Sequence, residues 1–406
     1  MILPRYCHFR PGLYPDGAAF MNLGFILFDY FPFGGLQRDC VKIARRCLER
    51  GHSVTICARA WQSERPAGIG VELFGRRGFS NISRNRHFLK QLADSLPRRG
   101  LDGVVGFNKV PGLDVYYGAD PCYAAKARRF KLAWYRWLPR FRHFAALERA
   151  VYEQGRGTEI LVLSETEIPI YQRHYGTEPE RFHVLPPGIT RCDFSQAQRQ
   201  EARQRVRREN GWRPEDKLLL LVGSGFRTKG LDRAIRSLAA LPVPGASAIH
   251  LAVIGQNRPG RFGLQARRLG VGSRVHFLGG RHDVPDFMLA ADFLLHPAYS
   301  ENTGTVLLEA LTVGLPVLTT DVCGYAHHVT KAAAGRVLPS PFCQEECNRA
   351  LREMLTTDQA SVWRENGLAY AAREDLYSCH ERAAELIEEI VRRKVARGGG
   401  CVGSKQ

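Results

Sequence analysis

Two glutamates eight positions apart, Glu301 and Glu309, form the spacing in this chain that most suggests chemistry. Between them the sequence reads Asn302-Thr303-Gly304, followed by an apolar run. Thr303 is a predicted N-cap, so a helix should begin near Gly304 and carry Glu309 in its second turn. The N–H groups and positive dipole end of such a helix attract phosphate, while carboxylates accept hydrogen bonds from sugar hydroxyls. An amphipathic helix with a solvated glutamate at each end would show the same pattern.

A turn of small and basic residues follows the apolar stretch 218–222. It reads Gly223-Ser224-Gly225-Phe226-Arg227-Thr228-Lys229-Gly230. Small residues let backbone amides approach a phosphate, and Arg227 and Lys229 can neutralise a departing diphosphate. The Walker spacing is absent, so the turn is not a P-loop.

A Gly-Gly turn also opens the first half of the chain. The strand pattern 23–28 is followed by Gly34-Gly35 and by a helix pattern that runs from Leu36 to Leu48. The paired glycines can bring backbone close to a diphosphate at a helix N-terminus, or they can form a tight turn without a ligand. No G-x-G-x-x-G is present, which disfavours a dinucleotide site.

The elements that must position these residues alternate between strand and helix patterns. Apolar strand patterns occur at 23–28, 54–57, 104–107, 160–164, 183–185, 218–222, 249–254, 275–278, 293–296 and 316–319. This alternation predicts an α/β protein with two Rossmann-like domains. Asp120 ends a polar stretch after the strand at 104–107, where open parallel sheets place ligands, although a helix-cap role for Asp120 is an equal alternative.

Composition limits the class of protein. A length of 406 residues suits two domains, and no apolar run approaches the roughly 20 residues of a membrane span. The net charge of +18 indicates an acidic partner such as nucleic acid, anionic lipid or a phosphorylated glycan. The 11 cysteines are scattered without a zinc-binding spacing, which is typical of free thiols in a cytosolic protein.

Residues 122–152 combine basic and aromatic side chains without an acidic residue between Asp120 and Glu148. Such a segment suits the surface of an anionic membrane. Its aromatic residues could instead stack on nucleic-acid bases, or the segment could be a core helix with a basic outer face. Pro139 argues against one long helix lying on a membrane. The residues predicted to contact the membrane are Arg128, Arg129, Lys131, Trp134, Arg136 and Trp137.

Several of these motifs together resemble a known family. Glu301 and Glu309, with Gly314-Leu315-Pro316-Val317 after them, resemble the signature of retaining glycosyltransferases of the GT-B fold. A second motif narrows the resemblance to the lipopolysaccharide-core glucosyltransferase I family, namely Phe31-Pro32-Phe33-Gly34-Gly35-Leu36-Gln37-Arg38-Asp39. The resemblance extends over about residues 21–390. The resemblance implies transfer of glucose from UDP-glucose to an inner-core heptose in α-1,3 linkage, with retention and without a metal or cofactor.

The resemblance also implies roles for individual residues. Asp120 would face the donor sugar near the reacting centre, Lys229 would neutralise the diphosphate, and Glu301 would hold sugar hydroxyls. Arg281 would recognise the uracil and ribose, although a surface arginine near a helix start is the alternative. The other implied substrate-binding residues are Gly34, Gly35, Asp39, Arg227, Asn302, Thr303, Gly304, Leu307 and Glu309.

This chain departs from the family pattern at two positions. The relatives place an arginine where this chain has Thr228, so Arg227 is the candidate to replace it. Their loop reads Glu-Ala-Ala-Gly where this chain reads Glu301-Asn302-Thr303-Gly304. Two added polar side chains beside the donor could shift donor choice towards a UDP-N-acetylhexosamine.

The expected organisation follows from the resemblance and the patterns together. The two domains are expected to face a cleft between them, on the cytoplasmic face of the bacterial inner membrane. A nucleotide-sugar 2-epimerase would share the fold without needing the basic aromatic segment, and a basic nucleic-acid-binding module would leave the paired glutamates idle. The predicted parts are a disordered extension or an upstream start at 1–20, an acceptor domain at 21–187, a UDP-sugar domain at 188–374, a helix at 375–395 returning to the first domain, and a disordered tail at 396–406.

Overall fold

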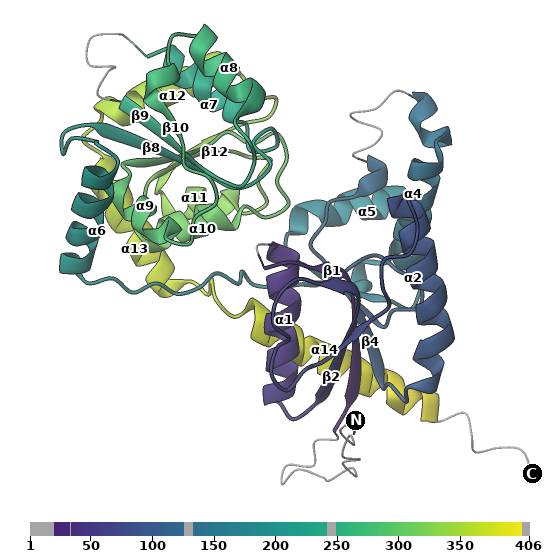
Figure 1. The fold of residues 1–406 in the computed structure, drawn as a ribbon. Coiled ribbons are helices and arrows are strands. Elements are labelled where there is room, and N and C mark those ends of the chain that lie inside the picture. Colours follow the sequence, from purple (N-terminus) through teal and green to yellow (C-terminus); the bar gives the residue numbers. More distant parts are fainter. Residues whose placement is uncertain (1–19, 33, 126–132, 242–248, 400–406) are drawn as a thin grey trace, which may run out of the picture. The chain divides into compact units, whose positions relative to one another are not determined.

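The computed structural model describes residues 20–32, 34–125, 133–241 and 249–399, so the predicted extension at 1–20 lies almost entirely outside the described residues. The chain divides into two units, each with its own parallel sheet (Figure 1). The first unit comprises residues up to Leu185 together with those from Cys379, and the second runs from Pro186 to Ser378. The two Rossmann-like α/β domains expected from the sequence are confirmed.

The first unit is built on a seven-stranded sheet in the order β3-β2-β1-β4-β5-β6-β7, and all neighbouring strands are parallel. Parallel strands covered by helices on both faces are apolar almost throughout, as in the buried centre of β1. Sequence patterns did not predict the short strands β3 and β5. The strands are β1 (Asn22–Tyr30), β2 (Ser53–Trp61), β3 (Gly70–Leu73), β4 (Gly103–Gly106), β5 (Val115–Gly118), β6 (Glu159–Val162) and β7 (Phe182–Val184).

Helices on the two faces of this sheet close two apolar cores. Helix α1 buries Cys40, Ile43, Ala44 and Cys47 at the helical spacing predicted from the sequence. The α-helices are α1 (Gly35–Glu49), α2 (Asn81–Ser95), α4 (Pro139–Tyr152), α5 (Ile168–Tyr175) and α14 (Cys379–Gly399). The 3-10 helices of the unit are η1 (Leu96–Arg98), η2 (Ala133–Trp137), η3 (Glu165–Glu167) and η4 (Pro179–Arg181).

Helix α14 corrects two predicted boundaries. The expected helix at 375–395 begins instead at Cys379, and it continues to Gly399 where a disordered tail from 396 was expected. The start is set by Asp375, whose carboxylate accepts hydrogen bonds from the backbone N–H groups of Tyr377 and Ser378 and so holds a turn before the helix. The apolar face of α14 packs in the first unit's core, as predicted, with Ala383, Ile387 and Val391 buried.

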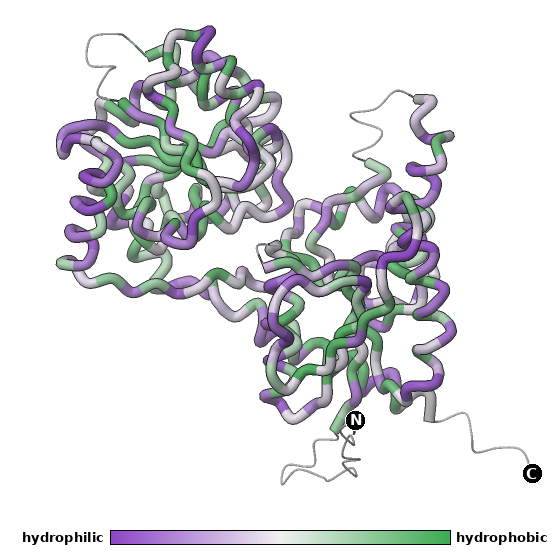
Figure 2. Tube along the Cα trace, in the orientation of Figure 1, coloured by the Kyte–Doolittle hydropathy of each residue, from purple (hydrophilic) through white to green (hydrophobic). Residues whose placement is uncertain are grey.

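The second unit has a six-stranded parallel sheet in the order β10-β9-β8-β11-β12-β13. Its strands are hydrophobic while the outer helix α6 is largely hydrophilic (Figure 2). The strands are β8 (Lys217–Val222), β9 (Ile249–Ile254), β10 (Val275–Phe277), β11 (Phe293–His296), β12 (Val317–Thr320) and β13 (Gly335–Leu338), of which β13 was not predicted.

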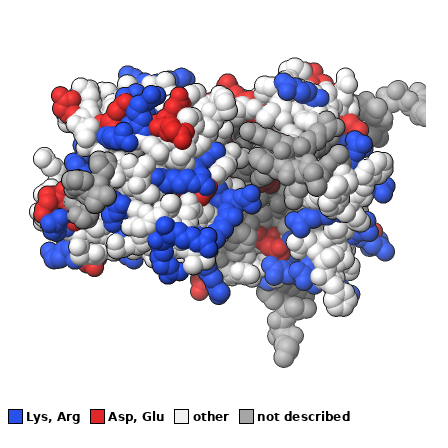
Figure 3. Space-filling model, turned by 90° about the horizontal axis from the view of Figure 1, so that it is seen from above, with Lys and Arg blue, Asp and Glu red and all other residues white. Residues whose placement is uncertain are grey.

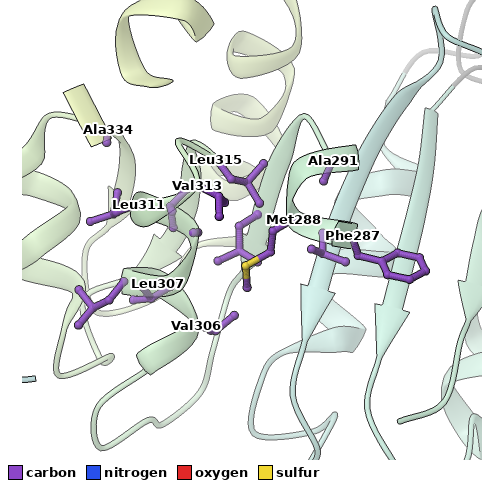
Figure 4. Close-up of a cluster of buried hydrophobic side chains, with 14 of the residues drawn as sticks. Phe287, Met288, Ala291, Val306, Leu307, Leu311, Val313, Leu315 and Ala334 are labelled. Carbon is purple, nitrogen blue, oxygen red and sulfur yellow. The ribbon is translucent and has the colours of Figure 1, made fainter. Parts of the chain in front are cut away.

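The helices of the second unit enclose two apolar cores, one of which is shown in Figure 4. In that core, Leu307 and Leu311 of α10 lie with Phe287 and Met288 of α9 among fully buried side chains. The α-helices are α6 (Gln196–Glu209), α7 (Leu231–Ala239), α8 (Gly260–Arg268), α9 (Val284–Ala290), α10 (Thr305–Thr312), α11 (Ala326–Ala332), α12 (Gln344–Thr356) and α13 (Ala360–Arg373), with the 3-10 helix η6 (Gly272–Arg274).

Both sheets reverse their strand order near the middle, between β1 and β4 in the first unit and between β8 and β11 in the second. Ligands of open α/β sheets bind beyond the carboxyl ends of the strands at such a reversal. Each unit therefore has one place where its topology favours a site. Basic side chains are spread over both units on the face shown in Figure 3, with acidic ones interspersed, so charge by itself does not single out either place.

Candidate active site

Lys229 and Glu301 meet at the strand reversal of the second unit. Lys229 lies in the turn after β8 and Glu301 in the loop after β11, 72 residues apart in sequence. The Lys229 ammonium donates a hydrogen bond to Glu301 Oε2, and both side chains are largely buried, with 18% and 16% of their surface exposed. The structure thus brings together two residues that the sequence predicted from separate motifs.

A buried histidine completes this cluster. His296, the last residue of β11, is fully buried, and its Nε2 lies 3.7 Å from Glu301 Oε2. Burial alone would raise the pKa of Glu301, but His296 and the Lys229 charge outweigh it and lower that pKa to about 2. Burial lowers the pKa of His296, so the imidazole is neutral. Glu301 is therefore an ionised acceptor beside a positive charge at neutral pH.

Close backbone approach fixes the distance between the two loops. The backbone N–H of Tyr299 donates to the Thr228 carbonyl over 2.8 Å. Gly230 has a φ of +74°, and a Cβ at this position would lie 1.9 Å from the Pro297 carbonyl oxygen. Only glycine fits there, because any side chain would push the loop that carries Glu301 away from Lys229.

Two residues of α7 that the sequence did not single out hold the same loop. The Arg233 guanidinium lies between the rings of Tyr299 and Phe342, 3.5 and 3.7 Å from their centroids. It also donates to the carbonyls of Pro297 and Ala298 at 3.1 and 2.8 Å. Asp232 accepts a 2.8 Å hydrogen bond from the Tyr299 hydroxyl. An arginine in an amphipathic helix gives no signal in sequence, because its stacking partner Phe342 is more than a hundred residues away.

The start of α10 differs from the prediction. The N-cap is Gly304, with a φ of +86°, and the helix begins at Thr305, so the predicted N-cap role of Thr303 is wrong. The glycine adopts a left-handed conformation that a threonine disfavours. The Thr303 carbonyl accepts instead from the Tyr325 N–H at 2.8 Å, and Glu301 forms a parallel bridge with Cys323. These contacts tie the loop after β11 to the loop after β12.

The other predicted residues of the second unit lie at varied depths. Glu309 is partly buried in the second turn of α10, as predicted. Leu307 is fully buried in the core of Figure 4, so it can reach a ligand only through its backbone. Arg227 is exposed beside Lys229. Arg281 makes two 2.7 Å hydrogen bonds to Asp283 in the turn after the edge strand β10.

The predicted residues of the first unit follow its central strands. Gly34 caps α1 after β1, whereas Asp39 accepts from the Tyr117 hydroxyl at 3.0 Å and contacts His380 of α14 at 2.9 Å. Asp120 follows β5 and is exposed. It lines a cavity of about 300 Å³ together with Phe28, Asn108, Lys109, Pro121, Tyr123, Phe144 and Leu147.

Glu148 of α4, which the sequence did not single out, lies fully buried behind this cavity. It accepts from Lys109 Nζ at 2.5 Å, from the Tyr175 hydroxyl at 2.7 Å, and from the N–H groups of Tyr123 and Ala124 at 2.9 and 3.0 Å. Burial opposes ionisation, but Lys109 and these N–H groups lower the pKa of Glu148 overall. Glu148 is thus a fully hydrogen-bonded carboxylate that holds the backbone around Tyr123 in place.

The predicted membrane residues fall into two groups. Arg128, Arg129 and Lys131 lie outside the described residues. Trp134 and Trp137 of η2 are exposed, and the Arg136 guanidinium lies 5.5 Å from the Trp137 ring centroid. None of the described helices has the length and apolar character that crossing a bilayer requires. Among the described residues, no group of three or more His, Cys, Asp and Glu side chains is arranged to hold a metal ion.

Two family models identify the class of protein to which this fold and site belong. Residues 202–370 match the model of the glycosyl transferases group 1, and residues 33–191 match that of glycosyltransferase family 4. The chain is therefore a glycosyltransferase of the GT-B type.

Comparison with individual proteins narrows the family. The chain is 46% identical to the lipopolysaccharide glucosyltransferase WaaG of Escherichia coli (strain K12), over 90% of this chain and 98% of that protein. A crystal structure of WaaG superposes with a TM-score of 0.84 over 90% of this chain and 99% of that chain. Anabaena Alr3699/HepE, solved with UDP and glucose, shares the fold at 19% identity and a TM-score of 0.70, over 90% of this chain and 99% of that chain. The chain belongs to the lipopolysaccharide glucosyltransferase family.

Proposed function

We propose that this enzyme transfers glucose from UDP-glucose to a heptose of the lipopolysaccharide inner core, in α-1,3 linkage. The observation that carries the proposal is the Lys229–Glu301 pair at the strand reversal of the second unit. A lysine ammonium there can take over the negative charge of a departing diphosphate, and an ionised carboxylate beside it can accept from sugar hydroxyls.

Lys229 would exchange its partner when the donor binds. Its ammonium now contacts Glu301, and a diphosphate carries more charge than a single carboxylate. Movement of the Lys229 ammonium from Glu301 to the diphosphate would leave Glu301 Oε2 free to bind the sugar. With Lys229 in contact, the Glu301 carboxylate is ionised at neutral pH, so its oxygens are ready to accept from sugar hydroxyls. Glu309, in the second turn of α10, would accept a hydrogen bond from the ribose.

The reaction would proceed with retention and without a metal. The acceptor hydroxyl oxygen forms a bond to the anomeric carbon on the face from which the UDP oxygen leaves, and the acceptor proton passes to the departing phosphate. In this scheme the protein orients the two substrates and stabilises phosphate charge. Asp120, exposed at the cavity of the first unit, would lie near the reacting centre.

The acceptor is anchored in a lipid, so the enzyme would work at the cytoplasmic face of the inner membrane. The exposed side chains of Trp134, Arg136 and Trp137 support contact with an anionic bilayer, because the aromatic rings favour the interface and the arginine favours anionic headgroups.

A transfer assay tests the proposal and its closest rival. Lipopolysaccharide that lacks the outer core is incubated with enzyme and UDP-glucose or UDP-N-acetylglucosamine, and the product is identified by mass. We expect a hexose to be added, with UDP released only when acceptor is present. Addition of an N-acetylhexosamine instead would favour the donor change suggested by Asn302 and Thr303. UDP release without acceptor modification, or conversion of the donor to its 2-epimer, would contradict glycosyl transfer to this acceptor.

A further inference from the structure

The three most exposed large hydrophobic side chains among the described residues are all aromatic, and all belong to the first unit. They are Phe79, exposed at 105%, Trp137 at 70% and Trp134 at 58%. Single exposed hydrophobic residues are ordinary, but a gathering of large ones indicates an interaction surface. The tryptophans precede α4, whereas Phe79 precedes α2 and lies in a loop that takes no part in the candidate active site.

The contacts between α2 and α4 place these aromatic residues at one end of the unit. Asn85 of the second turn of α2 lies 3.3 Å from His143 of the second turn of α4. Phe79 lies two residues before α2 and Trp137 two residues before α4, so this hydrogen bond places both residues at the same end of the unit. Figure 1 shows the two helices beside one another.

Both segments are basic and free of acid. No Asp or Glu occurs from Leu73 to Ala93, just as none occurs from Pro121 to Leu147. The exposed cations of the first stretch are Arg76, Arg77, Arg86 and Lys90, and those of the described part of the second are Arg136, Arg140 and Arg142. Exposed aromatic rings surrounded by cations complement a bilayer whose headgroups are anionic.

Hydrogen bonds hold the Phe79 loop in its outward conformation. Arg76 donates to Asp29 of β1 at 3.0 Å, Arg84 donates to the Gly78 carbonyl at 2.9 Å, and Ser80 caps α2. The Arg59 guanidinium bonds both Asp29 and Asn85, which ties the loop and the start of α2 to the sheet. The ring of Phe79 is thus presented to solvent from an anchored turn.

We infer that the loop 74–80, with Phe79 at its tip, is a second membrane-docking element that inserts beside Trp134 and Trp137 into the interface of an anionic bilayer. This inference rests on the membrane location in the proposed function. Two contacts at one end of the unit would fix its orientation on the bilayer, which one contact leaves free to rotate. A nucleic acid would be recognised through phosphates and stacked bases, and it is the rival partner to be tested.

Vesicle binding tests the inference. Co-sedimentation is measured with vesicles of phosphatidylethanolamine and phosphatidylglycerol in equal parts and with neutral phosphatidylcholine vesicles. We expect Phe79→Ser to weaken binding to the anionic vesicles about tenfold, from the apolar area lost. Arg77→Ala should weaken it about fivefold, because each basic residue near the surface contributes about 1 kcal/mol. A double variant at Trp134 and Trp137 measures how much the contact made by the two tryptophans contributes to vesicle binding.

Leu269 and Arg268 of the second unit provide matched controls, because both are exposed next to one another. Leu269→Ser and Arg268→Ala should leave vesicle binding unchanged. All variants should keep the wild-type melting temperature and affinity for UDP. Reduced binding in the tryptophan variant with wild-type binding in Phe79→Ser and Arg77→Ala would overturn this inference and leave the proposed membrane location intact. Failure of the wild type to bind anionic vesicles would overturn both.

Two further measurements distinguish insertion of the loop from adsorption on the bilayer surface and from nucleic-acid binding. In a background carrying Trp134→Phe and Trp137→Phe, the added Phe79→Trp should be quenched by brominated lipids more strongly than the background itself. Equal quenching would overturn insertion of the loop. A single-stranded oligonucleotide should bind wild type and Phe79→Ser equally and weakly, and a Phe79-dependent affinity above that for anionic vesicles would assign the surface to nucleic acid instead.

Discussion

Each unit contains a lysine–glutamate pair beyond the carboxyl end of a central strand, and the two pairs differ in what surrounds the carboxylate. In the first unit, the Glu148 oxygens accept from Lys109, a tyrosine hydroxyl and two backbone N–H groups. In the second unit, Glu301 has Lys229 as its side-chain donor, with the neutral His296 at 3.7 Å. Glu148 is fully buried, whereas both members of the second pair keep some exposure.

The difference separates a structural role for Glu148 from the ligand-binding role proposed for Glu301. A saturated buried carboxylate cannot release a donor without leaving a charge uncompensated, so Glu148 stabilises the fold. Glu301 can exchange one donor for another, because a sugar hydroxyl can replace the ammonium. The buried imidazole of His296, whose Nε2 lies 3.7 Å from Glu301 Oε2, stays beside it during that exchange.

The largest expected effect is on stability in the first unit. Glu148→Ala removes the partner of the largely buried Lys109 and the acceptor of two backbone N–H groups at once, so we expect the free energy of unfolding to fall by about 3–5 kcal/mol. Denaturant titration followed by circular dichroism measures it. Glu301→Ala is the matched variant of the second unit and should cost no more than about 3 kcal/mol. A loss below about 1 kcal/mol for Glu148→Ala would remove the distinction between the two pairs.

The next largest effect is on turnover. Lys229→Ala should lower turnover by a factor of about 100 to 1,000, or about 3–4 kcal/mol of transition-state stabilisation, because the departing diphosphate loses its charge partner. Turnover is measured well below the melting temperature, because Lys229→Ala also leaves the Glu301 carboxylate without its partner. The exposed Arg227→Ala serves as a control and should lose less activity. Near-normal turnover in Lys229→Ala with intact UDP affinity would contradict the role of Lys229 in neutralising the diphosphate.

Acid should weaken the contribution of Glu301 to stability. Its folded-state pKa of about 2 lies below the ordinary value of 4.5. The stabilisation, about 3 kcal/mol in full, is therefore present above pH 4.5 and lost as the pH falls towards 2. Glu301→Gln lacks this titration. Unfolding titrations at pH 7 and pH 3 should show the wild type losing roughly 2 kcal/mol more than the variant; parallel losses would argue against a strongly ionised Glu301.

Ligand affinities test the different roles proposed for the two glutamates whose spacing suggested chemistry in the sequence. Glu301→Gln should weaken binding of UDP-glucose by about 1.5–3 kcal/mol and leave UDP binding nearly unchanged, because UDP lacks the sugar. Glu309→Gln should weaken both ligands alike, since both carry the ribose. Calorimetric titration of both variants with both ligands measures this, and equal losses for the two ligands in Glu301→Gln would refute the division.

The sequence by itself determined the alternating α/β architecture, the two units and the residues at the second strand reversal. Apolar strands, glycine turns and the spacing of Glu301 and Glu309 are local features, so they can be recognised from the order of the residues alone. The strands β3, β5 and β13 escaped prediction, because glycine, polar or aromatic residues interrupt the aliphatic residues in their four positions. The N-cap of α10 differs from the predicted one because both Thr303 and Gly304 suit that position by residue type.

Only the tertiary structure decided which charges meet. Lys229 and Glu301 belong to separate motifs, and their contact depends on Gly230 and on the stacking of Arg233, which joins segments far apart in the chain. Nothing in the sequence around Glu148 or His296 distinguishes a buried polar residue from a solvated one. Burial and hydrogen-bond saturation are properties of the folded surroundings, so the contrast between the two lysine–glutamate pairs exists only once the chain has folded.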